Sequence, residues 1–167
     1  MCRSIKNLPI MSEHIATIHW ERRGADDFLK GKYSREHTWQ FDGGLKVPGS
    51  SSPSVVPTPW SNPANVDPEE AFVASASSCH MLTYLFLASR KGFQVDSYHD
   101  DAVGHMSKNE KGALWISSIT LNPKIVYGGE RTPAPADEEQ LHHQAHEECF
   151  IANSIKTEVV VAATKHA

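Results

Sequence analysis

The segment from Asp67 to Gly92 constrains the fold most, because it predicts one long apolar helix. Asp67 is a favourable N-cap residue, and Pro68 suits the first helical position. Two glutamates follow, where the positive end of the helix dipole favours them. Arg90 and Lys91 before Gly92 form a typical C-terminal stop. We therefore expect a helix from Pro68 to about Lys91.

Apolar side chains recur along this helix at spacings of three and four residues, which defines one apolar face. The stripe comprises Phe72, Ala76, Cys79, Leu82 and Phe86, and it is widened by Ala74, Leu85 and Ala88. A helix this long and this apolar is expected at the centre of a fold. Its most apolar stretch is far shorter than the roughly 20 residues of a membrane span.

Strand-like and helical patterns surround this helix. Turn signals lie at Asp42-Gly43-Gly44 and at Asn109–Gly112, and a long proline-rich ordered loop is expected from Pro48 to Pro68. A second helix should begin after an N-cap at Asp137 and run to about Cys149. Strands are predicted at Ile15–Trp20, Tyr33–Phe41, Gln94–Met106, Leu114–Lys124 and Ile155–Ala163. The order favours an α+β fold, with an antiparallel sheet packed on the helices.

Length and charge bound the kind of protein. The 167 residues suit one domain, and we expect residues 1–14 to be a loosely ordered leader before a single domain at 15–167. The net charge of −4 is spread along the chain, so no basic stripe indicates nucleic acid, and no membrane span is expected. No secretory signal is recognised, which favours a cytoplasmic protein. No cofactor and no metal are expected.

Three cysteines are present, at positions 2, 79 and 149, and their odd number argues against a disulfide framework. Cys2 lies in the expected leader and is interpreted as a free thiol without a role. A cysteine in mid-helix, such as Cys79, is most often a small buried hydrophobe. However, small residues precede Cys79, and Cys149 lies at the end of the other predicted helix. Two such cysteines could act together, since a thiolate attacks peroxide and a second thiol resolves the sulfenic acid.

Three segments resemble the OsmC/Ohr family of osmotically inducible and organic hydroperoxide resistance proteins. They are Asp67–Phe72, Ser77–His80 (Ser-Ser-Cys-His) and Ala145–Ser154, and they follow the family's order and spacing. The resemblance covers roughly Ile15 to the end of the chain. It implies an intertwined homodimer, with antiparallel sheets from both chains wrapped around two central helices.

The resemblance also implies an activity and roles for particular residues. Family members reduce hydroperoxides, and a dithiol such as a dihydrolipoyl group regenerates them. By this resemblance Cys79 is the peroxidatic cysteine, Cys149 the resolving cysteine and Glu69 the carboxylate that positions an activating arginine. The family supplies that arginine from an early strand near a short turn, and Arg35 fits this place better than Arg22 or Arg23, which are expected in a solvated turn. An arginine close to a thiol lowers its pKa and can bind peroxide oxygens.

Helix geometry limits how Glu69 and Cys79 could share a site. Ten positions separate them, which is about 15 Å along a straight helix. Three arrangements would bring them to one site: an arginine spans the gap, the helix is broken near its start, or the glutamate comes from the partner chain.

Other interpretations stay open at this point. His142, His143 and His146 have the spacing of zinc ligands on a helix, although a polar helix surface is the simpler explanation. His80 should point away from Cys79 as a packing residue. A cysteine hydrolase using Cys79, a histidine and Asn153 is a further possibility. The main alternative to a peroxidase is a non-catalytic dimer that binds a small molecule, given the spacing around Arg35 and the long proline loop.

Overall fold

The computed structural model describes residues 12–22, 24 and 27–162, and these form two compact units that meet in sequence at Pro68 and Glu69. Four parts of the sequence predictions lie outside the described residues: the leader before residue 12, Cys2, Arg23 and Ala163. The expectation of one domain over residues 15–167 stays a prediction.

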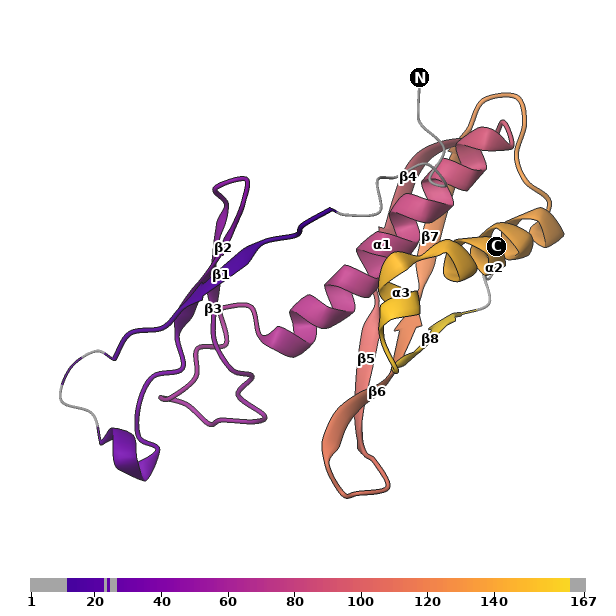
Figure 1. The fold of residues 1–167 in the computed structure, drawn as a ribbon. Coiled ribbons are helices and arrows are strands. Elements are labelled where there is room, and N and C mark those ends of the chain that lie inside the picture. Colours follow the sequence, from indigo (N-terminus) through magenta and orange to yellow (C-terminus); the bar gives the residue numbers. More distant parts are fainter. Residues whose placement is uncertain (1–11, 23, 25–26, 163–167) are drawn as a thin grey trace. The chain divides into compact units, whose positions relative to one another are not determined.

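The first unit is built on a three-stranded antiparallel sheet of order β1-β2-β3 (Figure 1). Its strands are β1 (Ala16–His19), β2 (His37–Phe41) and β3 (Lys46–Gly49), and a short 3-10 helix, η2 (Phe28–Lys30), precedes β2. The predicted turn at residues 42–44 joins β2 to β3, and Gly44 has the positive φ of 85° that this turn requires. Strand β3 was not expected, because Pro48 suggested loop. As an edge strand, β3 tolerates a proline that has no N–H to donate.

The predicted proline-rich loop is confirmed as an ordered segment that follows β3. Its two ends meet, because the Ser50 N–H donates to the Val66 carbonyl at 3.0 Å and the Val66 N–H donates to Pro48 at 3.1 Å. Inside the loop, the Asn62 N–H donates to the buried Ser50 hydroxyl at 2.9 Å. These bonds hold together a segment that has little regular structure of its own.

The second unit contains the long helix α1 (Pro68–Arg90), which begins at the predicted residue and ends one residue before the predicted end. Its strands form two sheets. One pairs β4 (Gln94–Asp100) with β7 (Pro123–Gly128), and the other has the order β5-β6-β8 from Val103–Lys108, Leu114–Leu121 and Glu158–Val161. The mixed α+β class is therefore confirmed. The all-antiparallel expectation is wrong in one place, because β6 and β8 pair in parallel.

Two predicted strands are each divided in two. The run Gln94–Met106 becomes β4 and β5, and the run Leu114–Lys124 becomes β6 and β7. At the point of division, the Asp100 carboxylate accepts from the Asn122 backbone N–H at 2.6 Å, and the Asn122 side chain donates to the Asp101 carbonyl at 2.9 Å. These side-chain bonds satisfy the backbone where the chain passes from one sheet to the other. The predicted Asn109–Gly112 turn joins β5 to β6, closed by a 2.8 Å bond from the Gly112 N–H to the Asn109 carbonyl.

The second predicted helix is found as two helices, α2 (Pro135–Glu148) and α3 (Phe150–Ser154). The N-cap prediction at Asp137 is wrong by three residues. The cap is Ala134, because Pro135 takes the first helical position that prolines favour. Asp137 still contributes to the cap, since its carboxylate accepts from the Ala134 N–H at 3.2 Å. The break between α2 and α3 falls at Cys149.

Helix α1 packs through two buried apolar clusters, one toward each end. Near its C-terminal end, Tyr84, Leu87 and Ala88 pack with Leu141 and Ala145 of α2. Nearer its start, Ala76 packs with residues of β6 and β8. The predicted apolar face is wrong at Leu82, whose side chain is 62% exposed, and His80 is buried instead. Because α1 is apolar on several sides, periodicity alone did not identify its buried stripe.

The sequence predicted no segment long and apolar enough to span a membrane, but by length and composition α1 meets that criterion. One such helix is weak evidence for a membrane span, because the core helix of a soluble protein meets the same criterion.

Candidate functional site

Cys79 and Cys149 lie side by side in the second unit. Cys79 is in the middle of α1, and Cys149 occupies the junction between α2 and α3. Their side chains are in hydrogen-bond contact, and both are free thiols. Cys79 is partly exposed, whereas Cys149 is 1% exposed. The fold therefore brings together two cysteines that are 70 residues apart in the sequence.

Backbone donors surround the two sulfur atoms. The Ile151 N–H donates to Cys79 Sγ at 3.5 Å, and the Ala152 N–H donates to Cys149 Sγ at 3.5 Å. Burial, and secondly the hydrogen bond with Cys79, raise the pKa of Cys149 to about 11. Cys149 therefore keeps its proton near neutral pH and can donate it toward Cys79. Donors directed at the Cys79 sulfur are the contacts that a thiolate accepts.

The helix break at Cys149 produces this arrangement. Cys149 has extended backbone angles (φ −72°, ψ 116°), so the chain turns between α2 and α3 and directs the next N–H groups at the sulfurs. The Asn153 side chain fixes the turn by donating to the carbonyls of Glu147 at 2.8 Å and Cys149 at 2.9 Å. This structural role of Asn153 does not favour the hydrolase hypothesis. Helix periodicity did not predict this break, for which Asn153, four residues after Cys149, was the available signal.

Glu69 lies in the first turn of α1, ten positions before Cys79 on the same helix. The helix is continuous from Pro68 to Arg90, so the arrangement with a break near its start is wrong. Glu69 is half-buried. The two remaining arrangements, a spanning arginine or a glutamate from a partner chain, stay open.

Arg35 lies in the first unit, just before β2, whereas the cysteines and Glu69 lie in the second. Its guanidinium donates to the Gly31 carbonyl at 2.8 Å and to the Tyr33 carbonyl, and it stacks 3.6 Å from the centre of the Tyr33 ring. Its backbone N–H donates to the Trp60 carbonyl at 2.9 Å, which ties it to the proline-rich loop. Its role toward Cys79 stays a prediction.

The histidines of α2 do not share one environment. His142 is buried against His80, whereas the His143 side chain is 66% exposed. A polar helix surface is therefore the wrong interpretation for His142 and the right one for His143 and for His146, which is also exposed. Within the described residues, no group of three or more histidines, cysteines or acidic residues is placed to hold a metal ion. His80 is a buried packing residue, as predicted.

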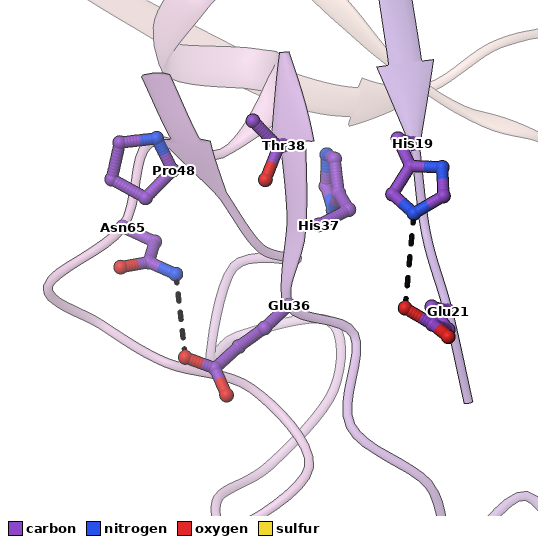
Figure 2. Close-up of a pocket in the computed structure, with 7 residues that line it drawn as sticks. All are labelled: His19, Glu21, Glu36, His37, Thr38, Pro48 and Asn65. Atoms are coloured by element: carbon purple, nitrogen blue, oxygen red, sulfur yellow. Dashed lines mark hydrogen bonds and ion pairs between the residues drawn. The ribbon is translucent and has the colours of Figure 1, made fainter. Parts of the chain in front are cut away.

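A separate small hollow of about 150 Å³ lies in the first unit (Figure 2). Two imidazoles and two carboxylates are among its lining groups: His19 Nε2 lies 3.9 Å from Glu21, and Glu36 accepts from Asn65 at 3.5 Å. The full lining is His19, Glu21, Glu36, His37, Thr38, Pro48 and Asn65. None of the four predicted site residues lines it, so the cysteine pair remains the candidate site.

Comparison with known proteins places this arrangement in a family. Residues 61–164 match the family model described as OsmC-like protein. A solved OsmC-like protein of unknown function from Vibrio cholerae is 51% identical; the match covers 91% of this chain and 99% of that one, with a TM-score of 0.88. No curated protein matches.

Two more distant structures share the fold. An organic hydroperoxide resistance protein OsmC from Legionella pneumophila is 15% identical, with coverage of 92% and 99% and a TM-score of 0.67. An organic hydroperoxide resistance protein from Elizabethkingia anophelis is 16% identical, with coverage of 94% and 100% and a TM-score of 0.67. The family match over most of the chain, with the close structural relative, shows that the chain belongs to the OsmC-like protein family.

Proposed function

We propose that this protein is a thiol-dependent peroxidase that reduces organic hydroperoxides through Cys79 and Cys149, with hydrogen peroxide tested as an inorganic substrate. The observation that carries the proposal is the pair of free thiols in contact, one partly exposed and the other buried with a raised pKa. This difference in exposure and pKa supports Cys79 as the peroxidatic cysteine and Cys149 as the resolving cysteine. Cys79 is accessible to a peroxide, whereas Cys149 keeps its proton and reacts only after Cys79 has been oxidised to the sulfenic acid. The hydroperoxide resistance proteins that share the fold support the same class of substrate.

The reaction proceeds in three balanced steps. The Cys79 thiolate attacks the terminal oxygen of ROOH, the O–O bond breaks, and the departing alkoxide takes a proton to give ROH and a sulfenic acid at Cys79. The Cys149 thiol then attacks the Cys79 sulfur, which releases water and forms a disulfide. Finally an external dithiol, of the lipoyl type, is oxidised to its cyclic disulfide as both cysteines regain their protons. No metal or organic cofactor takes part.

Arg35 and Glu69 complete the proposal. Arg35 would bind the peroxide oxygens and stabilise the thiolate, and Glu69 would hold its guanidinium. The continuous helix between Glu69 and Cys79 leaves two ways in which both could act on one peroxide: a bridging arginine side chain, or a Glu69 from the partner chain.

The assembly is proposed to be a homodimer in the cytoplasm. Large apolar side chains that are exposed in the single chain support an interface with a second copy, among them Leu82, Val126 and Phe150 at 56–62% exposure. An odd number of cysteines, three in all, argues against a disulfide framework and fits a reducing compartment. Light scattering coupled to size-exclusion chromatography gives the mass, and a monomer at micromolar concentration would contradict the dimer.

The experiment measures consumption of cumene hydroperoxide and of hydrogen peroxide, with dihydrolipoamide as the reductant. We expect no turnover with Cys79→Ser. Cys149→Ser should reduce about one equivalent of peroxide per chain and then turn over slowly, because no disulfide can form. Arg35→Ala should lower the rate of the first step at least tenfold, whereas Arg22→Ala serves as the matched arginine control. Glu69→Gln should also lower the rate of the first step, and Glu70→Gln, at the neighbouring position, is its matched control.

Each outcome has a clear meaning. Wild-type protein that consumes neither peroxide with any thiol would overturn the peroxidase, and a dimer that binds small molecules would then be the better account. Full turnover by Cys149→Ser would remove Cys149 from the mechanism, and equal effects of the two arginine variants would remove Arg35.

A further inference from the structure

Two buried imidazoles connect the helices that carry the two cysteines. His80 Nε2 of α1 lies 3.0 Å from His142 Nδ1 of α2, and the two rings are inclined by only 9°. The residues are 1% and 6% exposed. We call these two residues the imidazole pair. Since one hydrogen bond between two ring nitrogens needs a single N–H, one ring donates and the other accepts.

The surroundings keep the imidazole pair neutral. The pKa of each imidazole is lowered to about 4, mainly by burial. His146 also lowers the pKa of His80 and Asp100 raises it, while His80 lowers the pKa of His142. The Tyr84 ring packs against His142 with ring centres 4.3 Å apart. Among the described residues, no hydrogen-bond partner reaches the outer nitrogens, His80 Nδ1 and His142 Nε2. The hydrogen bond between the rings is therefore the directional contact of both side chains.

The imidazole pair lies next to the thiol pair along the chain. His80 directly follows Cys79, and His142 precedes Cys149 by seven residues, about 10 Å along a helix. The apolar contacts of Leu141 and Ala145 also hold α2 against α1, but such contacts permit sliding. A hydrogen bond between two rigid rings fixes the register of the two helices, and with it the place of Cys149 relative to Cys79.

We propose that His80 and His142 are positioning residues, whose mutual hydrogen bond holds α2 in the register that places the Cys149 thiol against Cys79. The inference rests on the proposed function for its biological meaning, because closing the disulfide is the second step of that reaction. The hydrogen bond between the rings would raise the effective concentration of the Cys149 thiol at Cys79, which favours the disulfide. The imidazole pair touches neither the peroxide nor the sulfur atoms in this role.

The test measures the thiol–disulfide equilibrium of the folded protein against oxidised and reduced dithiothreitol. Two electrons and two protons pass from Cys79 and Cys149 to the cyclic disulfide reagent, so no peroxide is needed. The asparagine amide lies near the Nδ1 position of a histidine, and the glutamine amide near its Nε2 position. His142→Asn should therefore retain the equilibrium constant within about twofold, whereas His142→Gln and His142→Leu should lower it about 2- to 10-fold, the usual worth of one hydrogen bond.

On α1 the two amides exchange roles, because His80 makes the hydrogen bond through Nε2 and not through Nδ1. His80→Gln should retain the equilibrium constant and His80→Asn should lower it. His143→Ala, next to His142 on the exposed side of α2, is the matched control and should change nothing. If a leucine variant does not fold, the asparagine and glutamine variants of the same position still decide the question, and urea unfolding confirms that they are folded. Equal equilibrium constants for the two amides at each position would overturn the proposal.

Nitrogen-15 NMR of the imidazole rings in wild-type protein gives an independent result. One bare and one protonated nitrogen should be seen on each of these two rings, with both rings neutral at pH 5.5. A protonated pair at pH 5.5 would overturn the proposal. Failure of this proposal can be distinguished from failure of the peroxidase proposal. If the wild-type protein turns over peroxide but the His80 and His142 variants keep its thiol–disulfide equilibrium constant, only the positioning role is rejected. If the variants change the thiol–disulfide equilibrium constant as predicted but the wild-type protein turns over no peroxide, only the peroxidase activity is rejected.

Discussion

The raised pKa of Cys149 gives a direct prediction about the order in which the two thiols react. Burial and the hydrogen bond with Cys79 raise this pKa from the ordinary 9.0 to about 11. Two pH units change the thiolate fraction about 100-fold: at pH 8 it is roughly one in ten for an ordinary thiol and roughly one in a thousand for Cys149. Cys149 should therefore react very slowly near neutral pH.

The assay is alkylation of the reduced protein with iodoacetamide, followed by mass spectrometry of the peptides that contain Cys79 and Cys149. Reaction rates measured between pH 6 and 11.5 give a midpoint for each thiol. The midpoint is the decisive quantity, since burial also slows access but lowers the rate at every pH alike. We expect the Cys149 rate to be still rising at pH 10.

A Cys149 midpoint near pH 9 would refute the reasoning, because it would show that burial and the contact with Cys79 do not hold the proton on Cys149. The unfolded protein in urea is the control. There Cys149 should alkylate with an ordinary midpoint, and the difference between the two midpoints then measures what the fold contributes.

Two further predictions concern stability. Because the imidazoles of His80 and His142 have pKa values lowered to about 4, the unfolded chain binds more protons than the folded one between about pH 6.5 and 4. The contribution of the two neutral imidazoles to the free energy of unfolding should therefore be fully present above pH 6.5. It should fall by about 3 kcal/mol for each imidazole, about 6 kcal/mol for the two together, as the pH drops to 4, measured by urea denaturation. A constant free energy of unfolding over this range would contradict the burial of the pair. Gly104→Ala should destabilise by about 1–3 kcal/mol, because its new Cβ would lie 2.5 Å from Val73 Cγ2, whereas Gly43→Ala has open space and should be neutral in the same thermal melts. Equal melting temperatures for the two variants would refute this explanation.

The sequence predicted well those features that local chemistry decides. Both ends of α1 were located to within one residue, because the proline, the acidic first turn and the C-terminal glycine act on their own neighbours. The turns at Asp42–Gly44 and Asn109–Gly112 were predicted for the same reason. The OsmC-like family was recognised from short segments around Cys79 and Cys149, and the family match confirms it.

The sequence also selected the two cysteines, but it could not show that they touch. That contact depends on the extended backbone of Cys149, which ends α2 and starts α3, and helix periodicity runs through this position without interruption. Likewise, the buried His142 and the exposed His143 are adjacent in the sequence, and only the packing of α2 against α1 separates their environments.

What the sequence alone determined is therefore the class of fold, the bounds of its central helix and the identity of the two thiols. The tertiary structure decided where long strands divide, which face of α1 is buried and that the pKa of Cys149 is raised. The physical reason is the range of the interactions. Caps and turns are satisfied within a few residues, whereas the bond from Asn122 to Asp100 and the burial of Cys149 depend on residues that only folding brings together.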